Sequence, residues 1–290
     1  MTLRRLLRWS AACFLGAAMA GGSAVASSGS VGTGPSGTAT TWTGNVETDF
    51  PSTQNGVITL VNPRYPSINP ESYITSNNLS TGWSIKDVRV MYNETQDTLY
   101  VGLNFFGLAG DSDGNGNAST VSPEAANRGA VDLPNLGGRE SITVGFYMTG
   151  GAKPDYLAGV PQNKQQAGTG INGFKFSAYQ NLNTSLAQSY GAELTQFQGD
   201  LYFDPSITHP DFVFSVKNFS QLPGYDPING FGLIAYAGSP DDTYSEEGAL
   251  FPRVAFGRIP EPATVLGWSL VALGAAWRIR ARKRRGVIQS

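Results

Sequence analysis

The chain contains very little cysteine, histidine or charge. Its 290 residues include one cysteine, Cys13, and one histidine, His209, and charged residues make up 14%. One cysteine cannot form an intrachain disulfide, and zinc hydrolases with an H-E-x-x-H motif need two histidines. A Ser–His–Asp triad would have to use His209, but no G-x-S-x-G turn accompanies it. The sequence therefore does not favour an enzyme, although paired carboxylates that hydrolyse glycosides stay open as an alternative.

Basic residues are concentrated at the two ends of the chain. Of the 20 lysines and arginines, three precede residue 27 and six follow residue 277, which leaves 11 against 21 acidic residues over residues 27–259. This central part therefore has a formal charge near −10, whereas the whole chain is at −2. Nucleic-acid binding needs clustered Lys and Arg, so we expect no nucleic-acid partner. An acidic surface is compatible with divalent cations.

The first 26 residues have the three parts of a secretory signal peptide. In order, these are Arg4, Arg5 and Arg8, then the apolar residues 11–20, then Ala24-Val25-Ala26 as a small-x-small cleavage site. A membrane anchor would need roughly 20 apolar residues, and this apolar core is too short. We therefore expect export and cleavage after Ala26. A flexible leader rich in Gly, Ser and Thr follows over residues 27–41.

The C-terminal end combines three segments with almost nothing between them. Pro260-Glu261-Pro262 is followed by the apolar residues 263–277 and by a basic cluster over residues 278–285. Two prolines prevent a helix interior, so the tripeptide stays extended. The apolar stretch can enter a bilayer, and the basic cluster resists translocation and binds anionic lipid on the cytoplasmic side. The apolar stretch has 15 residues, which is fewer than the roughly 17 to 25 of a simple spanning helix. We therefore expect a short, transient membrane helix.

This ordered triple resembles the PEP-CTERM sorting signal of exported bacterial proteins. The resemblance covers residues 260–285, about a tenth of the chain, and leaves residues 286–290 as a tail. In that family a membrane protease, exosortase, reads the Pro-Glu-Pro element and removes the tail. The resemblance implies an exosortase-type partner, transient anchoring in the inner membrane, and a final place at the cell surface or outside the cell. It says nothing about what the exported part does.

Residues 42–259 have the composition of an extracellular β protein. Short β-branched and aromatic runs alternate with clusters of Gly, Pro, Asn and Asp, and no βαβ rhythm appears. We predict an all-β fold: one antiparallel β-sandwich, jelly-roll-like, with about eight to ten strands. The best helical stretch is residues 182–194, although its periodicity is weak. The expected strands are residues 57–61, 85–92, 98–108, 141–148, 174–179, 201–203, 211–219 and 230–237.

The clearest hairpin joins residues 85–92 to residues 98–108 through a polar turn. Together with Trp83 it resembles the hairpin of DOMON-like and family-nine carbohydrate-binding sandwiches, which pair a tryptophan-led strand with an Asp-x-Leu-Tyr-Val strand. That resemblance implies a carbohydrate-binding role, and it covers about twenty residues. Haem binding is not carried over, since His209 precedes a proline in an expected turn. Aromatic residues that could stack on sugar rings are Trp42, Trp83, Tyr65 and Tyr156, although such residues more often belong to the core.

The most specific chemistry lies in the loop Asp111-Ser112-Asp113-Gly114-Asn115-Gly116-Asn117. Oxygen-bearing side chains at alternate positions followed by Gly match the start of an EF-hand calcium loop. The twelfth position is Ser122 rather than the bidentate Glu, so Glu124 or Asp132 would have to complete the site. The same residues also make an ordinary solvated turn, and both interpretations stay open. If a ligand is bound here, we expect Ca²⁺, and we expect no other cofactor.

Three classes of function follow from these observations. The first is an exported cell-surface or extracellular-matrix protein with a structural or binding role. The second is a carbohydrate-binding module, with or without the assistance of calcium, and with an extracellular polysaccharide as partner. The third is a hydrolase that acts on polysaccharides. The sorting signal favours the first class.

Overall fold

The computed structural model describes residues 42–64, 81–118, 120–127, 136–181, 185–203, 211–238 and 246–256. Several predictions lie outside these residues: the signal peptide, the leader, the sorting motif Pro260, Glu261 and Pro262, and the apolar residues 263–277. Tyr65, Asp132 and His209 lie outside them as well. Within the described part of the chain, no helix is both long and apolar enough to cross a bilayer.

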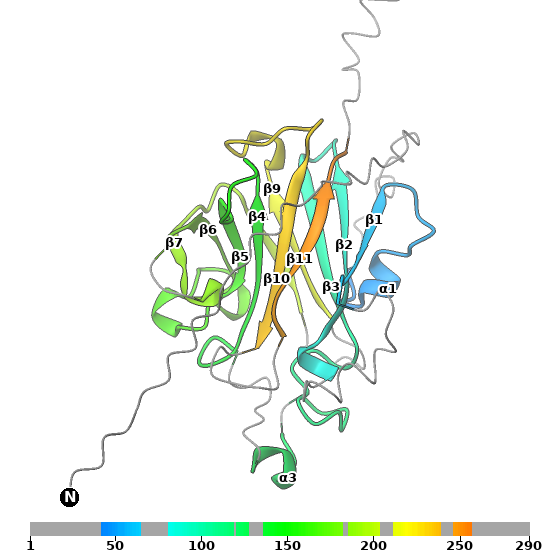
Figure 1. The fold of residues 1–290 in the computed structure, drawn as a ribbon, viewed down its shortest axis with the longest axis vertical. Coiled ribbons are helices and arrows are strands. Elements are labelled where there is room, and N and C mark those ends of the chain that lie inside the picture. Colours follow the sequence, from blue (N-terminus) through cyan, green and yellow to red (C-terminus); the bar gives the residue numbers. More distant parts are fainter. Residues whose placement is uncertain are drawn as a thin grey trace, which may run out of the picture.

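Two antiparallel sheets make up the described fold (Figure 1), which confirms the all-β class. The first sheet has five strands in the order β1-β2-β3-β9-β8. They are β1 Val57–Val61, β2 Ile85–Asn93, β3 Thr98–Phe105, β9 Phe212–Lys217 and β8 Gln198–Tyr202. The second sheet has six strands in the order β11-β10-β4-β5-β6-β7. They are β11 Glu246–Val254, β10 Phe231–Gly238, β4 Ser141–Tyr147, β5 Tyr156–Val160, β6 Lys175–Tyr179 and β7 Tyr190–Glu193.

The hydrophobic core lies between the two sheets. Strand β3 shows why: Leu99, Val101 and Leu103 alternate along it, and all three are fully buried in the main cluster. The rings of Phe146 on β4 and Phe214 on β9 meet edge to face with centroids 6.5 Å apart, so they join the two sheets directly. The sheets therefore pack face to face, as the alternating apolar pattern predicts.

The expected hairpin between β2 and β3 is confirmed, with Val90 opposite Val101 and Asn93 opposite Thr98. Its turn closes at Asp97, which has a φ of 46°, a conformation that Asp tolerates better than most residues. The carboxylate of Asp97 accepts a hydrogen bond from Tyr92 Oη at 2.8 Å. The long expected strand 98–108 is shorter in the structure, because β3 ends at Phe105.

Three strands differ from the sequence-based expectation, since β5, β7 and β11 were not expected as strands. All five residues of β5 are buried, so the segment shows no alternation of apolar and polar positions. The expected helix over residues 182–194 is wrong at its end, where β7 pairs with β6. Strand β11 contains Pro252, which an edge strand tolerates because its outer backbone groups need no partner.

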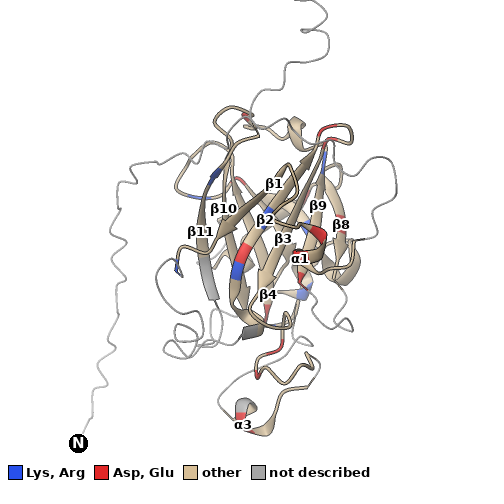
Figure 2. Ribbon diagram, turned by 90° about the vertical axis from the view of Figure 1, so that its right-hand side faces the viewer, with Lys and Arg blue, Asp and Glu red and all other residues tan. Residues whose placement is uncertain are grey.

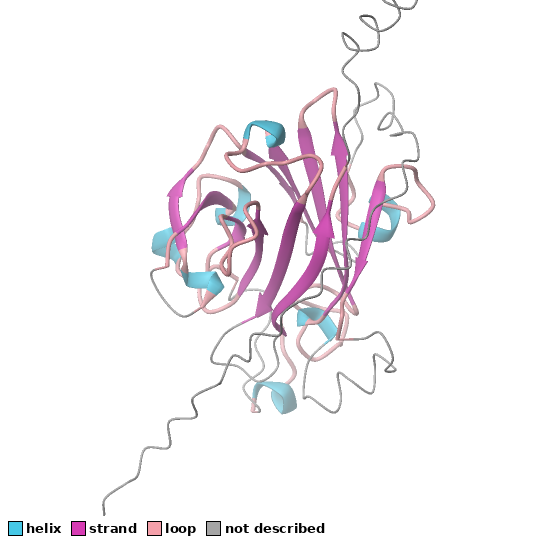
Figure 3. Cartoon of the chain, turned by 45° about the horizontal axis from the view of Figure 1, so that its top comes forward, coloured by secondary structure: helices cyan, strands magenta, loops and turns pink. Residues whose placement is uncertain are grey.

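Helices in the described residues are short (Figure 3). The α-helices are α1 Val46–Asp49 and α3 Pro123–Ala126. Single 3-10 turns cover Thr81–Trp83, Lys164–Gln166, Ile171–Gly173, Leu186–Gln188 and Phe219–Gln221. Asn45 caps α1, because its side-chain oxygen accepts hydrogen bonds from the backbone of Glu47 and Thr48.

The segment 42–56, which includes α1, crosses the outer face of the five-stranded sheet, and we call it the N-terminal strap. Figure 2 looks onto this face and shows acidic and basic residues on β2 near α1. The strap docks over Gly102 of β3, where an added Cβ would lie 2.7 Å from Val46 Cγ2 and 2.9 Å from the Phe50 ring. Val46, Phe50, Met91 and Val213 form a second, smaller apolar cluster beneath the strap. Glycine at position 102 therefore permits the strap to approach the sheet closely.

Candidate functional site

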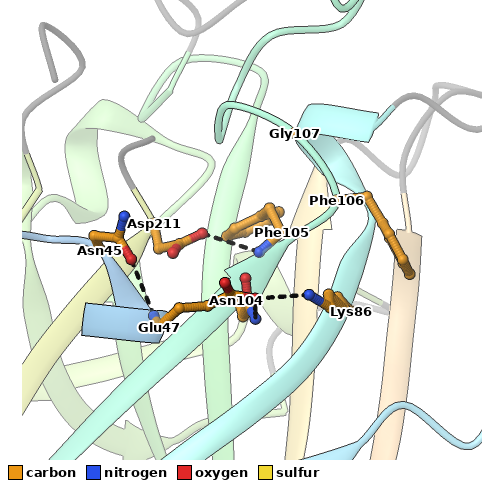
Figure 4. A pocket seen from close by; sticks show the side chains of 8 residues that line it. All are labelled: Asn45, Glu47, Lys86, Asn104, Phe105, Phe106, Gly107 and Asp211. Atoms are coloured by element: carbon orange, nitrogen blue, oxygen red, sulfur yellow. Dashed lines mark hydrogen bonds and ion pairs between the residues drawn. The ribbon is translucent and has the colours of Figure 1, made fainter. Parts of the chain in front are cut away.

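A pocket of about 260 Å³ opens between α1 and the ends of β2 and β3 (Figure 4). The strap, two adjacent strands and the residue before β9 all contribute to it. It is lined by Asn45, Glu47, Lys86, Asn104, Phe105, Phe106, Gly107 and Asp211. Since these residues come from four separate segments, the sheet register and the docked strap together create the pocket.

An ion pair forms the outer wall of the pocket. Glu47 Oε1 accepts a hydrogen bond from Lys86 Nζ at 2.7 Å, and both side chains are about half exposed. The hydrogen bond and the positive charge of Lys86 lower the pKa of Glu47. Because both charges are near water, the pair contributes little to stability.

A buried polar network supports the floor of the pocket. Asn104 Nδ2 donates to Asp87 Oδ2 at 2.9 Å, and Arg89 Nε donates to Asp87 Oδ1 at 2.9 Å. Arg89 Nη1 donates further to the carbonyl of Phe50 in the strap at 2.8 Å. All three residues are less than a tenth exposed. Such a satisfied network holds each group in one orientation.

Asp211 closes the inner end of the pocket and is 5% exposed. Its carboxylate accepts hydrogen bonds from Val46 N at 2.8 Å and Phe105 N at 3.0 Å, so it joins the strap to the end of β3. Burial raises the pKa of Asp211 to about 7, against the lowering effect of these two N–H groups, and the negative charges of Asp87 and Glu47 add to the rise. A carboxyl group that titrates near neutrality inside a pocket is a common feature of functional sites.

The predicted calcium loop forms a tight turn next to the core. Asp111 is 1% exposed, and its carboxylate accepts hydrogen bonds from the backbone of Gly114 at 2.8 Å and Gly116 at 2.7 Å. Burial and the neighbouring Asp113 carboxylate raise the pKa of Asp111, while these backbone bonds lower it. Behind the loop, the buried Trp83 donates from Nε1 to Ser112 Oγ at 2.9 Å. The structure therefore brings Asp111 and Asp113 together in one turn.

The structure describes three of the other predicted ligands of this loop, Asn115, Asn117 and Glu124. Asn115 Oδ1 accepts from the backbone of Asn117 at 2.7 Å, while Asn115 Nδ2 donates to the carbonyl of Thr120. Glu124 is exposed on α3, and Asp132 lies outside the described residues. Among the described residues, no group of three or more His, Cys, Asp or Glu side chains is placed to hold a metal ion. Calcium binding by this loop stays a prediction.

The four candidate sugar-stacking residues have different environments. Trp83 and Tyr156 are 2% and 8% exposed and belong to the core, so neither presents a ring face to a ligand. Trp42 is half-buried on the outer face, where it stacks on Tyr100 with centroids 4.6 Å apart and lies 5.8 Å from Tyr202. Tyr65 lies outside the described residues. Of the candidates that the structure describes, Trp42 is the one placed at the surface.

The pocket residues were missed by sequence reasoning. Asn45 and Asp211 are 166 positions apart in the chain and no motif links them. The one local signal is the alternation along β3, where Tyr100, Gly102 and Asn104 occupy the non-core positions. A glycine and an amide on the outer face of a strand indicate that something covers that face.

Comparisons with protein-family models, with curated proteins and with solved structures find no match for this chain. The functional interpretation therefore depends on the sequence signals at the two ends and on the chemistry of the outer face.

Proposed function

We propose that this chain is an exported bacterial cell-surface or extracellular-matrix protein that is processed at its C-terminal sorting signal. Its structural or binding role would be carried by a single jelly-roll-like domain over residues 42–259. The observation that carries the proposal is the ordered triple of Pro260-Glu261-Pro262, the apolar residues 263–277 and the basic cluster 278–285. An exosortase-type protease is the partner that this signal requires.

Replacing Glu261 or Pro262 with Ala tests this proposal in the producing cell. Both variants should stay full length and bound to the membrane, because the protease no longer reads the tripeptide. Immunoblotting of membrane and secreted fractions measures the outcome. A matched control is Pro252→Ala in β11, which changes a proline outside the tripeptide and should leave processing normal. Normal removal of the tail in both signal variants would overturn the sorting-signal interpretation.

A second candidate function is carbohydrate binding, and the outer face of the five-stranded sheet favours it. Trp42 of the strap forms an aromatic cluster with Tyr100 and Tyr202, and the polar pocket includes Asn104, four positions after Tyr100 on β3. Aromatic faces next to hydrogen-bonding groups suit sugars, which have apolar ring faces and polar edges. Retention of the full chain on immobilised neutral polysaccharides, compared with uncoated resin, tests this candidate.

A further inference from the structure

We propose that the pocket beside α1 binds one neutral, polyhydroxylated molecule about the size of a single sugar ring. This inference deepens the carbohydrate-binding candidate and rests on it, but it does not depend on the sorting signal. The ligand would form hydrogen bonds with Asn45, Glu47, Lys86 and Asn104.

The charges that line the pocket disfavour a ligand with net charge. An anion would approach the carboxyl groups of Glu47 and Asp211, and a cation would approach the ammonium group of Lys86. Glu47 and Lys86 already neutralise each other at 2.7 Å. A neutral ligand with hydroxyl groups avoids both conflicts, because a hydroxyl donates and accepts hydrogen bonds.

Hydrogen-bonding capacity remains on two of the residues that line the pocket, Asn104 and Asn45. Asn104 is 4% exposed, and its amide group donates to Asp87, so its orientation is fixed. Within the described residues its Oδ1 has no hydrogen-bond partner, and this acceptor belongs to a side chain that lines the pocket. Asn45 uses its oxygen to cap α1, which leaves its Nδ2 as a donor on the strap side. An oriented acceptor and an oriented donor in the same pocket suit hydroxyl groups, which both donate and accept hydrogen bonds.

The shape of the pocket limits the size of the ligand. Its volume of about 260 Å³ is below the roughly 300–1,000 Å³ of pockets for drug-sized molecules. A single ring fits this space, whereas an oligosaccharide would have to continue outside it. Phe106, which is half-buried, also lines the pocket from the β3 side, and its ring points away from Asn45 and Asp211 (Figure 4).

The test measures binding of glucose, galactose and mannose to the full chain by saturation-transfer NMR, with glucuronic acid and glucosamine as charged probes. At least one neutral hexose should bind more tightly than both charged probes. Glu47→Gln and Lys86→Met should each weaken that binding by about tenfold or more, since the first replaces a charged acceptor with a neutral amide and the second removes a charged donor.

The matched controls are Asp200→Asn and Lys217→Met, which alter an exposed ion pair of 3.3 Å on the same sheet but outside the pocket. Both controls should bind as the wild type does, and circular dichroism should show that all four variants are folded. Equal weakening in pocket and control variants, or tighter binding of a charged probe, would overturn the assignment of the pocket. If polysaccharide is retained while the pocket variants behave as the wild type does, the sugar does not bind in this pocket, and the carbohydrate-binding function stands. If neither polysaccharide nor hexose binds, both the assignment of the pocket and the carbohydrate-binding function are overturned.

Discussion

At the scale of single residues, two buried aspartates on the outer face have different partners. Asp87 pairs with Arg89 at 2.9 Å, so a positive charge compensates its burial. Asp211 has two backbone N–H groups but no ion pair among the described residues, and burial raises its pKa to about 7. The ionisation of Asp211 therefore couples the anchoring of the strap to pH.

This coupling predicts a pH-dependent stability that Asp211→Asn removes. The folded pKa of Asp211 is raised above its value in the unfolded chain, so the folded state holds the proton more tightly. The resulting stability is fully present below about pH 4 and is lost as pH rises through about 7. At pH 5 the Asp211→Asn variant should be less stable than the wild type by about 1–3 kcal/mol, because its amide has a donor where one of the two accepting oxygens of Asp211 was.

Urea unfolding at pH 5 and pH 8 checks this prediction. The difference in the free energy of unfolding between wild type and Asp211→Asn should narrow at the higher pH. Asp200→Asn serves as the control, because Asp200 is exposed and should give the same difference at both pH values. A wild-type advantage over Asp211→Asn that is constant with pH would contradict the raised pKa.

The two carboxylates of the Asp111–Asn117 loop lead to a second prediction at this scale. Without a bidentate Glu at the twelfth position, calcium affinity should be weak, roughly 10⁻⁴ to 10⁻³ M. Calcium bound by the folded state alone would stabilise the domain by about 2.7 kcal/mol at a hundredfold excess over the dissociation constant. Millimolar calcium should therefore raise the melting temperature.

The Asp111→Ala, Asp113→Ala double variant should lose this response to calcium, even though its melting temperature is lower because Asp111 is a buried acceptor. The shift between calcium and chelator, rather than the melting temperature itself, is the measured quantity. Identical melting of the wild type in calcium and in chelator would mean that the loop is only a turn.

At the scale of elements, the strap and strand β3 depend on each other. Gly102 lies under Val46 and Phe50, and Arg89 and Asp211 bind the backbone of the strap from the sheet. The four-residue helix α1 is too short to be stable alone, so its stability comes from this docking. The pocket wall formed by Asn45 and Glu47 thus exists only when the strap is docked.

Gly102→Ala should separate the strap from the sheet. The added methyl would lie 2.7 Å from Val46 Cγ2, which forces a shift and should cost about 1–3 kcal/mol of stability. The matched control is Gly232→Ala in β10, where the nearest atom would be at an ordinary 3.5 Å. Urea unfolding should show a clear loss for the first variant and a change of about 0.5 kcal/mol or less for the second. Equal effects of the two changes would show that the strap does not need Gly102.

At the scale of the whole molecule, the described residues end at Phe256, close in sequence to the expected sorting signal. Phe256 packs on Tyr92 and Phe231 with centroids 5.3 and 6.0 Å away, and Pro260 follows four positions later. Four extended residues span at most about 14 Å. If the tail enters a membrane as proposed, the end of the molecule that carries Phe256 therefore faces the bilayer at short range.

The sequence alone determined the all-β class and most of the strands, because alternation along a strand is a local pattern. It also contains the charge asymmetry and the three segments at the C-terminus, from which export was predicted. Strand β5 was not predicted because it is buried on both faces and therefore lacks that alternation. Strand β11 was not predicted because Pro252 argues against a strand except at the edge of a sheet.

Only the tertiary structure decided which residues share a site. It placed Trp83 and Tyr156 in the core, did not group Glu124 with Asp111 and Asp113 as metal ligands, and joined Asn45, Asn104 and Asp211 around one pocket. These residues are far apart in the chain and carry no shared motif. Their proximity and the pKa of Asp211 arise from strand register, from strap docking over Gly102 and from the exclusion of water, which are properties of packed segments rather than of local sequence.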